Sequence, residues 1–145
     1  MLHLNKESDK HMKNKRNFPI LTVTKKAEAA LKKGHPWVYD AEIMQIFGET
    51  ENGCLVDVVS TKGSYLGTGF LSTNSKIRVR VLSSNANESF SPAFWERRLK
   101  YAIDYRKTVM GDDFSCCRLV FGEADGLPGL TVDRFSDVIV TQVLS

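Results

Sequence analysis

Residues 32–40 read KKGHPWVYD and place two lysines, two turn-forming residues and two large aromatic rings in one short stretch. The glycine and the proline end the helix that the alanine-rich residues 25–33 predict, because proline pushes the preceding residue out of the α region and glycine favours a helix stop. In the extended segment that follows, Trp37 and Tyr39 share one face and Val38 points the other way. The stretch therefore predicts a sharp turn beside exposed cations, leading into a strand.

This stretch has two interpretations. Ammonium groups neutralise phosphate and flat rings stack on unpaired bases, so a basic turn that leads into aromatics suits a nucleic-acid contact. Large aromatic residues are also commonly buried, so Trp37 fits a core strand that follows a loop. Both interpretations stay open at this stage, and the first names Lys33, His35 and Trp37 as candidate RNA-binding residues.

Short strand patterns separated by Gly, Asn and Ser turns follow along the chain. Strands of this kind, spaced by about ten residues, indicate a small β-barrel, here over residues 19–90. The expected strands are 18–23, 41–47, 54–59, 65–71 and 77–82.

The last of these strands alternates cleanly between apolar and basic residues. Its apolar residues face one way, and Lys76, Arg78 and Arg80 face the other. Cations on one strand face stand roughly 6–7 Å apart, a spacing that suits successive phosphates. Because no acidic residue lies within the segment, the row predicts a binding surface for RNA, with an ordinary solvated strand face as the alternative.

A second unit is predicted over residues 91–145. Ser91 and Pro92 form a good helix start, and the amphipathic pattern runs to about Met110. The strands expected after it flank the turn DGLPG. A helix with this hairpin and a strand that runs to the chain end predicts an incomplete central α/β domain, so the fold class is α+β.

Composition excludes a membrane-spanning class. The chain has 145 residues, of which 42% are hydrophobic and 26% charged, and no apolar run approaches the roughly 20 residues of a span. Residues 1–18 carry five Lys or Arg against two acids, which predicts a disordered basic arm, either an aid to nucleic-acid attraction or a solvated tail. The start lacks an apolar secretory segment, so we expect a cytoplasmic protein.

Three segments together carry a family resemblance: residues 34–39 (GHPWVY), 77–81 (IRVRV) and 118–134 (RLVFGEADGLPGLTVDR). They resemble the front of the bacterial 23S ribosomal RNA large-subunit methyltransferase I family, over residues 20–145. The resemblance implies a PUA domain, a central α/β domain and a C-terminal Rossmann-like domain that binds S-adenosylmethionine and methylates cytosine C5. It also implies ribosomal RNA as the partner.

No residue of this sequence matches the cofactor loop, the acidic ribose-binding residue or the catalytic cysteine that the family places in its C-terminal domain. The stretch 67–69, Gly-Thr-Gly, lacks the third glycine and the helix of a dinucleotide-type loop. Cys116 and Cys117 precede the central hairpin, and with Cys54 they show no C-x-x-C spacing, so we expect reduced structural thiols. We therefore expect no catalytic residue, cofactor site or metal ligand, and no activity of this chain alone.

Three hypotheses follow. The leading one is the RNA-binding front portion of a ribosomal RNA methyltransferase, which positions RNA for a catalytic domain that this chain lacks. The second is a free-standing PUA-like module that binds RNA or protein, and whose central unit completes its sheet as a homodimer or by pairing with another protein. The third is a small hydrolase, with Glu123, Asp125 and Asp133 acting with His35. This third hypothesis is disfavoured, because paired carboxylates need a defined separation in a cleft and His35 lies in the other predicted domain. A structural role, with Asp125 capping the turn, is favoured instead.

Overall fold

The computed structural model describes residues 16–144 and divides into two compact units, one ending at Glu88 and the other beginning at Ser89. The predicted basic arm lies, up to position 15, outside the described residues. Within the described chain, no helix combines the length and the apolar character needed to cross a membrane.

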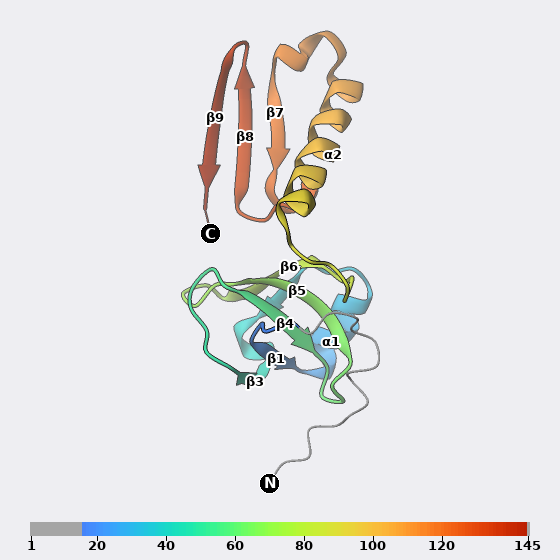
Figure 1. Ribbon diagram of the computed structural model, residues 1–145, viewed down its shortest axis with the longest axis vertical. Helices are drawn as coiled ribbons and strands as arrows, with labels where there is room; N and C mark the ends of the chain where they lie inside the picture. The colour runs from blue at the N-terminus through green and yellow to red at the C-terminus, as the bar shows by residue number, and fades with distance from the viewer. Residues whose placement is uncertain (1–15, 145) are drawn as a thin grey trace. The chain divides into compact units, whose positions relative to one another are not determined.

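The first unit is a six-stranded sheet with one short helix (Figure 1). The strand order is β2-β6-β5-β4-β1-β3, and neighbours are antiparallel except for β1 and β4. The edge strands β2 and β3 are joined directly by the 3-10 turn Asp40–Glu42, so the sheet curls as predicted, although this turn shortens the strand expected over 41–47. The elements are β1 (Ile20–Val23), α1 (Lys25–Lys32), β2 (Trp37–Tyr39), β3 (Ile43–Phe47), β4 (Leu55–Val59), β5 (Tyr65–Leu71) and β6 (Ile77–Ser83).

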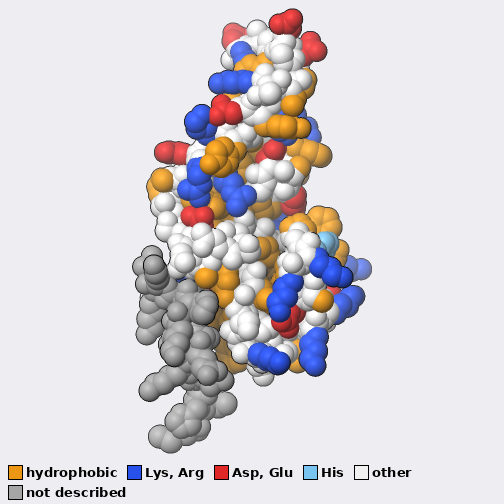
Figure 2. Space-filling model, turned by 90° about the vertical axis from the view of Figure 1, so that its right-hand side faces the viewer, with side chains coloured by type: hydrophobic (Ala, Val, Ile, Leu, Met, Phe, Trp, Pro, Cys, Tyr) orange, Lys and Arg blue, Asp and Glu red, His pale blue; other side chains and the backbone are white. Residues whose placement is uncertain are grey.

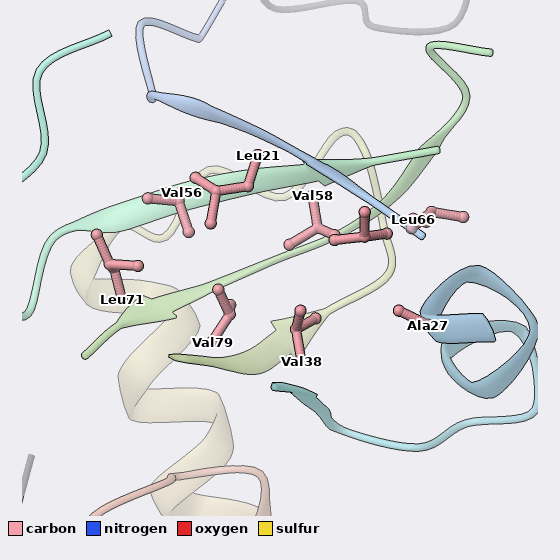
Figure 3. Packing of buried hydrophobic residues seen from close by; sticks show 9 residues of the cluster. Leu21, Ala27, Val38, Val56, Val58, Leu66, Leu71 and Val79 are labelled. Carbon is pink, nitrogen blue, oxygen red and sulfur yellow. The ribbon is translucent and has the colours of Figure 1, made fainter. Parts of the chain in front are cut away.

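Apolar side chains fill the interior of this curled sheet (Figure 3). Val38 lies opposite Val79 in the ladder between β2 and β6, and both are fully buried. Because strand side chains alternate between faces, the burial of Val38 directs Trp37 to the outer face, where it is half-buried and outside the core cluster. The buried cluster consists of Leu21, Val23, Ala27, Val38, Val56, Val58, Leu66, Leu71 and Val79.

The turn between α1 and β2 forms as the sequence predicts. At the start of α1, the hydroxyl of Thr24 accepts a hydrogen bond from the backbone N–H of Ala27 at 3.3 Å. At its end, Gly34 has a φ of +88° and donates its N–H to the carbonyl oxygen of Leu31 at 2.9 Å. Glycine adopts this positive φ without strain, so α1 stops and the chain turns into β2.

A buried polar network covers the outer face of β4 and β5. Arg16 Nη2 lies 3.5 Å from Asp57 Oδ1, and the two side chains are only 8% and 6% exposed. Arg16 Nη1 also donates to Thr68 Oγ1 at 3.3 Å and to the carbonyl oxygen of Glu88 at 3.2 Å. Burial raises the pKa of Asp57, although the Thr68 hydrogen bond and the Arg16 charge pull it down. Arg16 is thus part of the first unit, which corrects its assignment to a disordered arm over 1–18.

The second unit combines one helix with a three-stranded antiparallel sheet of order β7-β8-β9 (Figure 1). The predicted helix is confirmed from Pro92 to Met110, and its fully buried aromatic residue is Phe94. The elements are α2 (Pro92–Met110), two 3-10 turns (Gly111–Ser115 and Gly122–Asp125), β7 (Cys116–Phe121), β8 (Leu130–Phe135) and β9 (Val138–Val143).

The core of the second unit lies between α2 and the first two strands. Ala102 of α2 packs with Val120 of β7 and Leu127 of the following turn, and Trp95 of α2 adds to this cluster. By contrast, β9 is exposed along its whole length. Only part of this small sheet is therefore covered by the described residues.

Candidate nucleic-acid interface

The outer face of β2, β6 and β5 brings aromatic and cationic side chains into one row. Trp37 lies opposite Arg80 across β2 and β6, and Arg80 lies opposite Phe70 across β6 and β5. Residues that lie opposite each other in neighbouring strands point to the same face of a sheet. Because the adjacent pair Val38 and Val79 faces the core, this row faces outward. We call Trp37, Arg80 and Phe70 the outer row.

Three rings gather at the β2 end of the outer row. The ring centroids of His35 and Trp37 are 5.6 Å apart, those of His35 and Tyr39 are 6.3 Å apart, and those of Trp37 and Tyr39 are 6.5 Å apart. His35 and Tyr39 are stacked, and both are exposed. The indole Nε1 of Trp37 is buried and has no hydrogen-bond partner among residues 16–144. This cluster presents flat rings on which an unpaired base can stack.

Two exposed lysines accompany these rings in the sequence. Lys33 lies at the end of α1, and Lys76 lies immediately before β6, with its carbonyl oxygen accepting the N–H of Asp40 at 2.9 Å. Neither lysine forms an ion pair within the described part of the chain. Figure 2 shows Lys and Arg side chains gathered around a histidine on one face of the molecule. The ammonium groups of Lys33 and Lys76 are therefore available to a polyanion.

Arg78 is already engaged within the protein. Its Nε donates to Asp40 Oδ1 at 2.9 Å, and its Nη2 donates to the same oxygen. Its Nη1 donates to the carbonyl oxygens of Ser72 and Thr73. The expectation that no acid interrupts the row of cations is therefore wrong, because Asp40, 38 residues earlier in the chain, supplies a carboxylate.

Arg80 is held by longer hydrogen bonds. Its Nη1 donates to Ser72 Oγ and to the carbonyl oxygen of Ile77, both at 3.4 Å, beyond the usual range for such bonds. The guanidinium belongs to a row with an aromatic ring on either side, and planar guanidinium groups stack readily on rings. Arg80 is therefore a cation that lies opposite an aromatic residue on each of the two neighbouring strands.

The structure brings together part of the predicted set and adds residues to it. Trp37 and Arg80 meet across two strands, and His35 contacts Trp37, as a binding surface requires. Sequence reasoning left out Tyr39 and Phe70. The alternation within 65–71 places Phe70 on the face opposite Leu71, but its position beside Arg80 depends on the pairing register, which no local pattern encodes.

Two of the acidic residues near β7 and β8, Asp125 and Asp133, have arginine partners. Arg106 binds Asp125 through two hydrogen bonds of 3.2 and 2.8 Å, and Asp125 also accepts the N–H of Phe121 at 2.6 Å. Arg118 binds Asp133 at 2.8 and 3.0 Å, and these hydrogen bonds lower the pKa of Asp133. Asp125 thus has the structural role favoured from the sequence. No cluster of three or more His, Cys, Asp or Glu suited to a metal occurs in the described chain.

The residues present do not fit the S-adenosylmethionine loop that the family resemblance implies for the longer proteins. Gly67 and Gly69 lie inside β5, where a Cβ on Gly69 would overlap the carbonyl oxygen of Arg80 and one on Gly67 would press on Val81. These glycines let two strands approach closely instead of surrounding a cofactor. The thiols of Cys54, Cys116 and Cys117 are free, with Cys116 exposed and the other two half-buried.

Comparison with protein families agrees with this geometry. A model of the PUA-like domain matches residues 21–84, which include α1 and all six strands of the sheet except the first residue of β1. The first unit is therefore a PUA-like domain.

Related proteins extend the match to the second unit. The chain is 39% identical over 129 residues to ribosomal RNA large subunit methyltransferase I of Klebsiella pneumoniae, covering 88% of this chain and 32% of that protein. The corresponding protein of Salmonella typhi is 38% identical with the same coverage. The chain is therefore similar to ribosomal RNA large subunit methyltransferase I of these bacteria, and it spans about a third of the length of these relatives.

A solved structure of a candidate SAM-dependent methyltransferase from Streptococcus mutans shares the fold. Its TM-score is 0.72 at 22% identity, covering 87% of this chain and 33% of that one. Another match of the same TM-score, identity and coverage is a candidate methyltransferase complexed with SAH. At this identity the two structures support the α+β fold alone.

Proposed function

We propose that this chain is the RNA-binding portion of a ribosomal RNA methyltransferase, and that RNA binds at the outer row and the residues beside it. The observation that carries the proposal is the row of Trp37, Arg80 and Phe70, with the stacked rings of His35 and Tyr39 at its end. An arginine between two half-buried rings, with the exposed rings of His35 and Tyr39 beside it, suits single-stranded RNA, whose bases stack on aromatics while its phosphates are neutralised. The names of the relatives supply ribosomal RNA as the substrate class.

The proposed contacts divide into two kinds. Lys33, Lys76 and Arg80 neutralise phosphates, and Trp37 with His35 stacks on unpaired bases. Arg78 acts as a positioning residue in this proposal. Its hydrogen bonds to Asp40 and to the turn after β5 hold the ends of β2 and β6 in place beside the rings.

In this proposal, the chain positions the bound RNA for methylation at cytosine C5. The transfer from S-adenosylmethionine is carried out by the part of the longer proteins that this chain does not match. The PUA-like domain over 19–90 holds the RNA, and the unit from 91 onward is the beginning of a central domain. In this proposal, the methyl-donor site and the catalytic group belong to that further part of the longer proteins. The place of action is the cytoplasm.

Salt dependence tests the phosphate contacts. Each phosphate neutralised on a single strand contributes about −0.7 to the slope of log affinity against log salt. Replacing Lys33, Lys76 and Arg80 with alanine should therefore flatten the slope by roughly 2 units in the triple variant. The measurement is fluorescence anisotropy with a labelled transcript of large-subunit ribosomal RNA at several salt concentrations.

A matched control is Lys62→Ala, which removes an exposed lysine from the turn between β4 and β5. This variant should bind with an unchanged slope. A triple variant that stays folded and binds with the slope of the unmodified chain would exclude the proposed phosphate contacts.

A second candidate function, a self-associating module, is favoured by β9. Val138, Ile139 and Val140 of this strand are 53%, 51% and 50% exposed, and the strand carries no charged residue within Val138–Val143. Exposed apolar edge strands pair readily with another strand. Sedimentation equilibrium should then show a homodimer that Val140→Lys dissociates, whereas a monomer at all concentrations rejects this candidate.

A further inference from the structure

A pocket of about 340 Å³ lies in the first unit, beside the ends of the strands that carry the outer row. Asp40 directly follows β2, and Arg78 is two residues before Arg80 on β6, so the pocket adjoins the proposed RNA surface. The volume is at the lower end of the roughly 300–1,000 Å³ found for small-molecule sites, which suits a single ring system. Its lining residues are Asp40, Ile43, Ile46, Thr50, Leu71, Thr73 and Arg78.

The pocket has an apolar side. Leu71 is 2% exposed and belongs to the core cluster, and Ile43 packs against that cluster. Ile46 is 47% exposed although it lies opposite the fully buried Leu21 in the ladder between β1 and β3. An isoleucine left half-exposed at the mouth of a pocket provides an apolar surface for a flat ligand.

The polar side of the pocket is a carboxylate with a fixed orientation. Both hydrogen bonds from Arg78 to Asp40 end on Oδ1, and Nη1 of Arg78 is bound to two backbone carbonyl oxygens. Asp40 Oδ2 has no hydrogen-bond partner among the described residues, and the side chain is 61% exposed. Arg78 therefore orients the carboxylate and leaves one acceptor oxygen for a ligand.

A carboxylate beside a phosphate-binding surface discriminates between parts of an RNA strand. It repels phosphate oxygens, but it accepts hydrogen bonds from the N–H groups of base edges, as acidic side chains do from the amino group of cytosine. Guanine, adenine and cytosine each carry an exocyclic amino group, whereas the single N–H of uracil lies between two carbonyl oxygens that a carboxylate repels.

We propose that this pocket receives one unpaired nucleobase bearing an exocyclic amino group, with the amino group donating to Asp40 and the ring lying against Ile46. The proposal rests on RNA binding by the adjoining outer row. It gives the surface a preference against uracil that phosphate contacts and ring stacking do not provide.

The test uses fluorescence anisotropy with 5′-labelled ten-nucleotide RNAs: oligo(U), and oligo(U) with one central cytosine, adenine or guanine. The unmodified chain should bind the three substituted strands roughly tenfold more tightly than oligo(U), the effect of one good base contact. Asp40→Asn should remove most of this preference, measured within this variant as the ratio of the affinities for the substituted strands to the affinity for oligo(U). Ile46→Trp fills the mouth of the pocket and should remove the preference while the ion pair of Asp40 stays intact.

Glu49→Gln is the matched control, since it removes a negative charge from an exposed loop of the same unit, and it should keep the preference. Salt-dependent binding of all four strands with equal affinity overturns the pocket proposal and leaves RNA binding standing. Retention of the preference in both Asp40→Asn and Ile46→Trp also overturns it. Failure of every strand to bind at low salt overturns the pocket and the proposed function together.

Discussion

Replacing Arg16 with methionine tests whether the residues before β1 hold the PUA-like domain together. The side chains of Arg16 and Asp57 form a buried ion pair, with only 8% and 6% of their surfaces exposed. Removing one partner of a buried ion pair typically costs about 3–5 kcal/mol, because the other charge stays buried without compensation. Arg16 also lies over the rings of Phe18 and Tyr65, at 5.8 and 5.3 Å, and loses these contacts as well.

The expected loss for Arg16→Met is therefore at least about 3 kcal/mol at neutral pH, which corresponds to roughly a hundredfold faster amide exchange in β4 and β5. The pKa of Asp57 is already raised by burial, so the folded protein binds this proton more readily than the unfolded chain. The stabilisation that comes from protonating Asp57 is present below the unfolded pKa and is lost as pH rises through the folded pKa. Without Arg16 that pKa rises further, so the variant should recover stability on mild acidification.

The assay is hydrogen–deuterium exchange of the segment 55–71 at neutral and mildly acidic pH, with urea unfolding as a second measure. The double variant Arg16→Met with Asp57→Asn should regain part of the loss, because no buried charge remains. Lys62→Met, at an exposed site, is the control and should exchange as the unmodified chain does. An acceleration of less than about fivefold for Arg16→Met, or no recovery in the double variant, would refute this account of the buried pair.

Three further predictions concern single contacts. Gly69→Ala should lower the free energy of unfolding by about 1–3 kcal/mol in urea titrations. The added Cβ would overlap the backbone carbonyl oxygen of Arg80, which is held in the neighbouring strand. Asp125→Ala should cost about 3–5 kcal/mol, since it leaves Arg106 without its partner in a pair whose side chains are 13% and 10% exposed; a loss under 1 kcal/mol would contradict this. NMR titration should give Asp133 a pKa below that of an unpaired aspartate, and the Arg118→Ala variant should bring this pKa back toward the unpaired value. Because folding lowers this pKa, the stabilisation from the Arg118–Asp133 pair is present above the unfolded pKa and disappears as pH falls through the folded pKa.

The binding surface depends on features of very different range. The rings of His35, Trp37 and Tyr39 come from one short stretch, in which a turn followed by a strand is enough to bring them within about 6.5 Å of one another. The addition of Arg80 and Phe70 requires three strands to pair in one register. A shift of one residue would turn the whole set toward the core, so the surface and the core are specified together.

Local chemistry in the sequence was sufficient to predict most of the elements. Gly34 ends α1, Pro92 begins α2, and alternation marks β6, because these signals act over a few neighbouring residues. The motif that resembles the methyltransferase family likewise lies in contiguous segments, and the related proteins bear out that resemblance.

The tertiary structure alone decided which charges are available. Arg78 faces Asp40 from 38 positions away, and Arg16 enters the fold by reaching Asp57 and a carbonyl 72 positions further along. Coulomb attraction and hydrogen bonding act through space, and pairing register determines which distant residues meet. A row of basic residues in a sequence therefore indicates where charge lies along the chain, and only the fold shows which of those charges the protein has already neutralised.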